Sequence, residues 1–354
     1  MKEAYLRWYY WYQNFGDELL LFWVIEYLFT TYNLEKLTIE VGSKKRIDER
    51  LAKNSTLIPR PASLSFVEIR QHKFRRLTHL INLIGLGKYK HMFKFFGGGE
   101  VLSDERPFPH DGRNIPLLFN WTVKKWNFIL LGGIGTPKKS RTRMLYKDLL
   151  PRAQEIVLRD PTSLNTVERY TGNGKRINRS PLSVALHEDF SLAVLRKFSL
   201  SPFATEKESF RVKGEARRAE GFKSSTTSWS PSFAKEDKID IQHYVLVNIN
   251  TATCTTDNIH KIQLFCQEHP GCKIIFFPCD MDDDYKCFDI IKSNIPTIEM
   301  YDWRKYSLEK TLQLFADTEA GIGSRLHFLL PLKFFNKPFH SIAKAEKVQK
   351  MLNS

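Results

Sequence analysis

An arginine and a histidine stand two residues apart in the stretch GIGSRLHFLL, residues 321–330. A guanidinium can hold a carboxylate or phosphate through two parallel hydrogen bonds, and an imidazole can give or take a proton near neutral pH. We expect the two glycines to bend the chain out of a short strand and Ser324 to cap a helix whose first turn holds Arg325 and His327. Residues two apart point to different sides of a helix, so both could reach a ligand seated on its N-terminus.

A cation at a helix N-terminus opposes the helix dipole, and a bound anion would offset that cost. The alternative is an ordinary ion pair of Arg325 with the other domain, beside a core histidine. We favour a functional role because the arrangement breaks a local rule with no compensating group visible in the sequence. The enzymatic hypothesis would fail if the Arg325 and His327 side chains were turned away from the groove, or locked against protein carboxylates with no room for a ligand.

Three glycine clusters follow apolar segments in the first half of the chain: NFGD at 14–17, FGGGE at 96–100 and LGGIG at 131–135. Glycine lets a backbone approach a ligand closely, and the N–H groups of a following helix can hold an anion. A plain turn between strand and helix is the simpler interpretation of any one cluster, and three clusters on consecutive strand ends weaken that interpretation somewhat. None has the spacing of a dinucleotide-binding or P-loop motif.

Arg159 ends an apolar segment in LRDPTS, just before an expected helix with Asp160 at its N-cap and Pro161 in its first position. Its guanidinium could hold a carboxylate or phosphate, or it could pair with Asp160 or another neighbour. The acidic run DMDDDY at 280–285 is interpreted as the start of a helix rather than a metal site, because calcium-loop spacing is absent. His187 and Asp189 could be a site pair or part of a turn.

Apolar segments alternate with helical patterns along most of the chain, which predicts an α/β fold with parallel sheets. We expect two Rossmann-like domains, 1–198 and 241–354, facing across a cleft where the carboxyl ends of the strands bind the ligand. Residues 199–240 are rich in Ser, Lys, Glu and Arg without a helical or strand period. They predict a polar, flexible insertion or linker between the domains.

The net charge of +15 over 354 residues predicts an anionic partner. No recognition motif for nucleic acid is present, so we expect none to bind, and anionic lipid or phosphorylated small molecules remain. The longest apolar stretch, ELLLFWVIEYLF, carries Glu26 and is too short to span a bilayer, and no signal-peptide cleavage site is seen, so a cytoplasmic protein is expected. Five cysteines without a CxxC pair predict reduced thiols.

The ordered motifs give a more specific clue. They are NFGDELLL, FGGGEVLSD, LGGIGTP, VLRDPTSLNTVERYTG, HEDFSLAVL and GIGSRLHFLLPLKFFNKPFHSIAKAEKV. With these motifs in this order, the chain resembles the polysaccharide pyruvyl transferase family, including its Arg-Leu-His signature. It departs from the family around Asp189, where EDF replaces a frequent Asp-Pro, and in the polar insertion. The resemblance implies a fold similar to that of GT-B glycosyltransferases.

The resemblance also implies a reaction: transfer of a pyruvyl group from phosphoenolpyruvate to a sugar of a surface or extracellular polysaccharide, or of its lipid-linked precursor, to form a ketal. Arg325 and Arg159 would hold the donor, His327 would be the general acid or base, and Asp104 would orient the acceptor or pair with His327. No cofactor or metal is implied beyond the donor. The other expected substrate-binding residues are Asn14, Gly16, Asp17, Gly98, Gly99, Gly133, Ser324 and Leu326.

If the acceptor is lipid-linked, the basic surface would bind the anionic cytoplasmic face of the inner membrane. Two other functions stay open. One is a glycosyltransferase that uses a nucleotide sugar on the same architecture, with a pyrophosphate at the same helix N-terminus. The other is a non-catalytic basic protein that binds polyanions.

Overall fold

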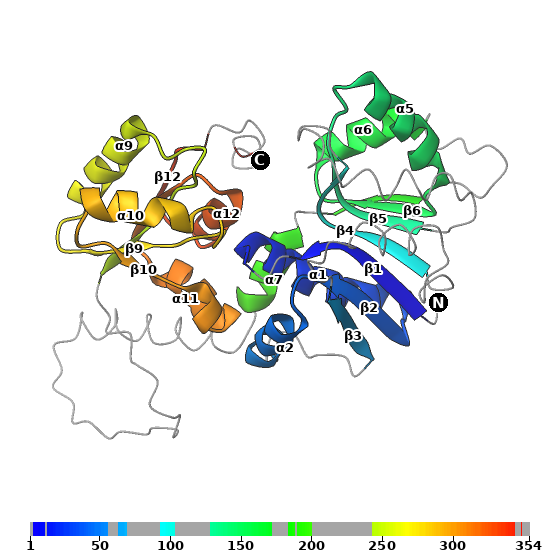
Figure 1. Cartoon of the computed structure of the whole chain (residues 1–354), viewed down its shortest axis with the longest axis horizontal. Helices are drawn as coiled ribbons and strands as arrows, with labels where there is room; N and C mark the ends of the chain where they lie inside the picture. Colours follow the sequence, from blue (N-terminus) through cyan, green and yellow to red (C-terminus); the bar gives the residue numbers. More distant parts are fainter. Residues whose placement is uncertain are drawn as a thin grey trace, which may run out of the picture. The chain divides into compact units, whose positions relative to one another are not determined.

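The computed structural model describes residues 3–10, 13–55, 63–68, 93–102, 128–171, 183–187, 190–199, 243–343 and 348. The chain divides into two compact units, Met1–Val194 and Leu195–Ser354 (Figure 1). The predicted linker lies outside the described residues except for Ser199, which ends a helix. The proposed division into two domains and a linker therefore stays a prediction.

The first unit is built on seven strands in the order β3-β2-β1-β4-β5-β6-β7, and every neighbouring pair is parallel. The strand order reverses direction between β1 and β4, the place where open parallel sheets bind ligands. The strands are β1 (Glu3–Tyr10), β2 (Lys36–Val41), β3 (Leu64–Glu68), β4 (Phe93–Leu102), β5 (Phe128–Ile134), β6 (Glu155–Leu158) and β7 (Ser183–Leu186).

Helices connect these strands on both faces of the sheet. They are α1 (Phe15–Tyr32), α2 (Lys44–Lys53), α5 (Ser140–Leu149), α6 (Pro161–Thr171) and α7 (Phe190–Ser199), with a short 3₁₀ helix η1 (Leu150–Arg152). Figure 1 shows α5 and α6 on one side of the sheet and α1 and α2 on the other. Right-handed crossovers require this, because the chain moves across the sheet in opposite directions before and after the reversal.

The core of the first unit explains its apolar segments. Every residue of β5 is buried, as expected for a strand covered on both faces. On the side of α5 and α6, Phe96, Leu130 and Ile156 pack with Tyr146 and Val167. The segments that alternate between strand and helix in the sequence therefore form one doubly covered sheet.

The second unit has five parallel strands in the order β10-β9-β8-β11-β12. The strands are β8 (Tyr244–Asn248), β9 (Lys273–Phe276), β10 (Glu299–Met300), β11 (Ala320–Gly323) and β12 (Phe339–Ser341). The helices are α9 (Thr256–Gln267), α10 (Tyr285–Asn294), α11 (Leu308–Asp317) and α12 (Leu326–Phe334), with a 3₁₀ helix η2 (Trp303–Lys305). Here the strand order reverses between β8 and β11, so the predicted α/β class with parallel sheets is confirmed in both units.

Two further sequence predictions have structural answers. All five cysteines are free thiols, as predicted. Within the described ranges, none of the helices combines the length and the hydrophobicity needed to cross a lipid bilayer.

Candidate active site

Arg159 follows β6 directly and is a buried cation. Its side chain and backbone together are 6% exposed, and its Nε atom is buried without a hydrogen-bond partner among the described residues. Asp160 does not pair with it. Asp160 instead accepts hydrogen bonds from the N–H and hydroxyl of Ser163, both at 2.8 Å, and so caps α6 as predicted. The alternative of an Arg159–Asp160 ion pair is therefore wrong, and the guanidinium has no carboxylate in the described part of the chain.

The end of β5 lies against this guanidinium. A methyl group added to Gly133 would stand 3.1 Å from Arg159 Nε and 3.4 Å from its Nη2, so glycine leaves the space that the guanidinium uses. Ser163 Oγ accepts a hydrogen bond of 2.8 Å from the Ile134 N–H and thereby ties α6 to β5. The ends of β5 and β6 and the first turn of α6 thus surround a buried cation, and the first turn of a helix suits an anion.

The other predicted residues of the first unit belong to the same edge of the sheet. Asn14 follows β1 and caps α1, its side-chain oxygen accepting from the Asp17 N–H at 3.2 Å, and Gly16 and Asp17 form the first turn. Gly98 and Gly99 lie in β4, where its register against β5 shifts. Since β1, β4, β5 and β6 are consecutive parallel neighbours, their carboxyl ends follow one another along this edge.

Two predicted acids cannot be placed. Asp104 and Asp189 lie outside the described residues, so their roles stay predictions. His187 follows β7, donates its backbone N–H to the Leu158 carbonyl at 2.8 Å, and contacts the edges of the Trp23 and Tyr27 rings. The histidine thus packs in an aromatic cluster at the end of β7.

In the second unit, α12 begins at Leu326, and Arg325 is its N-cap in extended conformation, with φ −92° and ψ 135°. The prediction that Ser324 caps this helix is wrong. The backbone N–H of Arg325 donates to the side-chain oxygen of Asn248 at 3.1 Å, which holds Arg325 at the end of β8. Its carbonyl accepts the N–H groups of Phe328 and Leu329, so the helix starts one residue later than expected.

The sequence predicted that Gly321 and Gly323 bend the chain out of the strand. They instead lie within β11. A methyl group on Gly321 would stand 2.5 Å from Leu332 Cδ1, and one on Gly323 would overlap the Phe328 ring. Both glycines are therefore needed for the close packing of α12 on the strand that precedes it. Their spacing reflects helix–strand contact rather than a turn.

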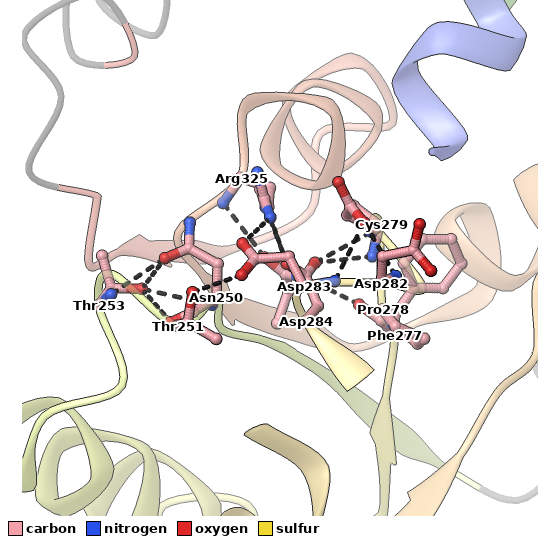
Figure 2. A network of polar contacts seen from close by, with 12 residues as sticks. Asn250, Thr251, Thr253, Phe277, Pro278, Cys279, Asp282, Asp283, Asp284 and Arg325 are labelled. Carbon is pink, nitrogen blue, oxygen red and sulfur yellow. Dashed lines mark hydrogen bonds and ion pairs between the residues drawn. The ribbon is translucent and has the colours of Figure 1, made fainter. Parts of the chain in front are cut away.

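The Arg325 side chain is not an uncompensated cation. It donates from Nε at 2.9 Å and from Nη2 at 2.6 Å to Asp284 Oδ1, and from Nη2 at 2.5 Å to Asp283 Oδ2 (Figure 2). The expectation that no group offsets its charge is wrong. The two carboxylates that do so are 41 and 42 residues away in sequence, so no local pattern revealed them. The expected alternative, a pair with the other domain, is also wrong, since both carboxylates belong to the same unit. Arg325 is thus held by protein carboxylates, the arrangement that counts against it as the primary anion-binding group.

Asp284 is the anchor of this network. Its Oδ2 accepts from Asn248 Nδ2 at 2.9 Å, from the Cys279 N–H at 2.9 Å and from the Asp280 N–H at 3.2 Å. Burial raises the pKa of Asp284, and the Arg325 charge and these hydrogen bonds offset only part of that rise. Burial acts to lower the pKa of Arg325, but the charge and hydrogen bonds of Asp284, together with Cys279 and the Asp283 charge, raise that pKa overall. The acidic run therefore serves a guanidinium, which the sequence did not reveal.

Ser324, Leu326 and His327 accompany Arg325 at the helix start. Ser324 is 5% exposed, and its Oγ is buried without a hydrogen-bond partner among the described residues. His327 is the second residue of α12 and is half-buried, with its Nε2 atom shielded from solvent. The predicted residues of the second unit do lie together at the place where its strand order reverses. Sequence reasoning missed Asn248, Asp283 and Asp284 as their supports.

Comparison with known proteins agrees with this architecture. A family model described as polysaccharide pyruvyl transferase matches residues 14–343. No curated protein gives a significant match. Among solved structures, the UDP-GlcNAc 2-epimerase from Neisseria meningitidis bound to UDP-GlcNAc is similar with a TM-score of 0.56 at 11% identity, covering 99% of this chain and 85% of that one.

A second solved structure, the UDP-GlcNAc 2-epimerase from Methanocaldococcus jannaschii, gives a TM-score of 0.51 at 13% identity, with 100% of this chain and 92% of that one covered. At such low identity the likeness concerns the fold alone. It places this chain in the GT-B-like class of α/β folds that carry two Rossmann-like sheets.

Proposed function

This chain belongs to the polysaccharide pyruvyl transferase family, and from that premise we propose that it transfers the pyruvyl group of phosphoenolpyruvate to two hydroxyls of a sugar. Both hydroxyl oxygens bond to the central carbon of the donor and phosphate leaves. One hydroxyl proton converts the donor methylene to a methyl group, and the other leaves with the phosphate. The product is a cyclic ketal on a surface polysaccharide or on its lipid-linked precursor.

The observation that carries the proposal is the buried guanidinium of Arg159, which has no carboxylate partner among the described residues. A charge taken out of water without a partner is costly, so a site of this kind is stabilised by an incoming anion. Phosphoenolpyruvate carries a carboxylate and a phosphate, both suited to a planar guanidinium and to the first turn of a helix. Gly133 and the start of α6 provide that surrounding here.

The remaining roles follow from the helix start in the second unit. His327 transfers a proton, since an imidazole with a pKa of about 6.5 can act as acid or base, and positioned proton transfer contributes about 10²- to 10⁴-fold in rate. Arg325 is a second donor contact that the protein keeps charged and oriented through Asp284. Ser324 Oγ, buried and without a hydrogen-bond partner in the described ranges, is a further contact. No cofactor takes part in this scheme.

The test is the rise in melting temperature that phosphoenolpyruvate causes in the full chain. Wild type should be stabilised, Arg159→Ala should lose the effect, and His327→Ala should keep it while releasing no phosphate with any acceptor. Arg152→Ala, an exposed arginine of the same unit, is the matched control and should behave as wild type. Equal stabilisation of wild type and Arg159→Ala would refute the assignment. Retained polyanion binding with no phosphate release in wild type would favour a non-catalytic protein.

A second candidate rests on the structural likeness. The Neisseria epimerase that shares this fold is bound to UDP-GlcNAc, so a nucleotide sugar is the obvious alternative ligand. A glycosyltransferase would place its pyrophosphate at the same kind of helix N-terminus. Stabilisation by a UDP-sugar and none by phosphoenolpyruvate would decide for this alternative.

We also propose that the protein contacts an anionic membrane at its cytoplasmic face, through α5. Residues 138–152 contain six Lys or Arg against one Asp, and all six cations are exposed, as is Met144 at 69%. Because α5 follows β5, its first turn lies toward the strand edge that carries Gly133 and Arg159. A lipid-linked acceptor would then meet the enzyme on the side of its donor site.

A further inference from the structure

The two carboxylates that hold Arg325 differ in burial and in attachment. The Asp284 side chain is 0% exposed, and five hydrogen bonds from Arg325, Asn248 and two backbone N–H groups fix its oxygens. The Asp283 side chain is 34% exposed and is bound by Arg325 and by the hydroxyl of Thr251. Asp284 is therefore fixed in place, whereas Asp283 can be displaced at much lower cost.

The two carboxylates also use different edges of the guanidinium. Asp284 Oδ1 takes one N–H from Nε and one from Nη2, which is one bidentate edge. Asp283 takes the other N–H of Nη2. Nη1 makes no hydrogen bond to any residue that the structure describes. An incoming carboxylate or phosphate could use the Nη1–Nη2 edge, but Nη2 already donates to Asp283 Oδ2.

From this geometry we infer that Asp283 is an internal competitor for the donor anion at Arg325, and that Asp284 is the positioning residue that holds the guanidinium. The inference rests on the proposed function. Two carboxylates on one guanidinium leave the network with a net charge of −1, which repels an anionic donor. When the donor binds, Asp283 leaves Nη2 and rotates toward solvent, while the Asp284 contacts persist.

The prediction is a pair of opposite effects on donor affinity, measured by calorimetry with phosphoenolpyruvate and, as a simpler anion, inorganic phosphate. Asp283→Asn removes the competing charge and should tighten binding by about 3- to 5-fold. Asp284→Asn releases the guanidinium and should weaken binding by more than about 10-fold. General loosening of the fold cannot tighten binding, so the rise in affinity of Asp283→Asn separates competition from a structural role.

Asp282→Asn is the matched control, because it makes the same charge change one residue away, and Figure 2 shows Asp282 apart from Arg325. It should leave the affinity at the wild-type value. Unchanged affinity in Asp283→Asn, or an equal gain in Asp282→Asn, overturns the inference. The proposed function fails separately, if wild type does not bind phosphoenolpyruvate or if Arg159→Ala binds it equally well. Even then the phosphate measurements still test the competition at Arg325.

Discussion

Arg159 and Arg325 have the same side chain in opposite electrostatic surroundings. Arg159 is buried with no carboxylate bonded to it in the described ranges, and Arg325 is bonded to two. The sequence motif put Arg325 first as the anion-binding residue. We propose Arg159 instead for the main electrostatic attraction, because no described carboxylate compensates its buried charge. Arg325 contributes orientation, since its position is already set by Asp284 and Asn248.

The space beside Arg159 gives a test at the residue scale. Gly133→Ala should push the guanidinium by a few tenths of an ångström and weaken phosphoenolpyruvate binding about fivefold, or ~1 kcal/mol, with a melting temperature close to wild type. Gly97→Ala is the contrast, because its methyl would lie 2.5 Å from the Leu131 carbonyl oxygen and must move backbone. That variant should lose about 1–3 kcal/mol of stability. Normal donor affinity in Gly133→Ala would show that the guanidinium does not need this space.

Several residue roles could be predicted from the sequence and others could not. The cap of α6 by Asp160 followed from the Asp-Pro pair, a local signal. The ion pairs of Arg325 could not be predicted, because they depend on β8 lying between β9 and β11 in the sheet, which brings together residues 41 and 42 positions apart. The glycines of β11 were misinterpreted for the same reason. The two glycines allow α12 to pack closely on β11, and such a contact cannot be recognised from the neighbouring sequence.

At the scale of elements, a buried ion pair joins α1 to α2. Both oxygens of Glu18 accept from Arg50 Nε at 3.0 Å, and the two side chains are 2% and 5% exposed. Burial raises the pKa of Glu18, and the Arg50 charge lowers it only in part. The pair therefore fixes the first turn of α1, where Asn14, Gly16 and Asp17 lie, more by geometry than by net stabilisation.

Removing the charge of one partner should lower the free energy of unfolding far more than replacing both partners with apolar residues. Glu18→Gln removes the carboxylate that faces the buried Arg50 charge and should cost about 3–5 kcal/mol of unfolding free energy. The double variant Glu18→Leu/Arg50→Met should recover most of that loss, because no charge stays buried. Denaturant unfolding of the two variants measures the difference. Equal stability of the single and the double variant would contradict the argument.

At the scale of the whole molecule, the order of the motifs and the alternation of strand and helix were enough to predict an α/β fold with parallel sheets and the family. These features are repeated over the chain, so no single misassigned residue changes them. The excess of positive charge was also visible, but not its location. The structure adds that all six cations of residues 138–152, before, in and just after α5, are exposed.

The basic α5 face predicts lipid binding that depends on charge. Flotation with vesicles of phosphatidylglycerol at low salt should retain wild type, and vesicles of phosphatidylcholine should not. The triple variant Lys139→Glu/Arg141→Glu/Lys147→Glu should lose retention, since each basic residue near an anionic surface contributes ~1 kcal/mol. Lys261→Glu/Lys286→Glu/Lys310→Glu makes the same charge change on exposed helix positions of the second unit and should stay bound. Equal loss in both triple variants would point to net charge rather than to this face.

The bonds among Asn248, Asp284 and Arg325 have a consequence for recombining this protein with its relatives. The three residues come from three separate stretches of the chain, yet each one satisfies the others' buried groups. A chimera joined anywhere between residues 249 and 283 would inherit the asparagine from one parent and the other two from the second. Unless both parents carry the same three residues, such hybrids would contain an incomplete hydrogen-bond network. Junctions before residue 243 would transfer all three residues together.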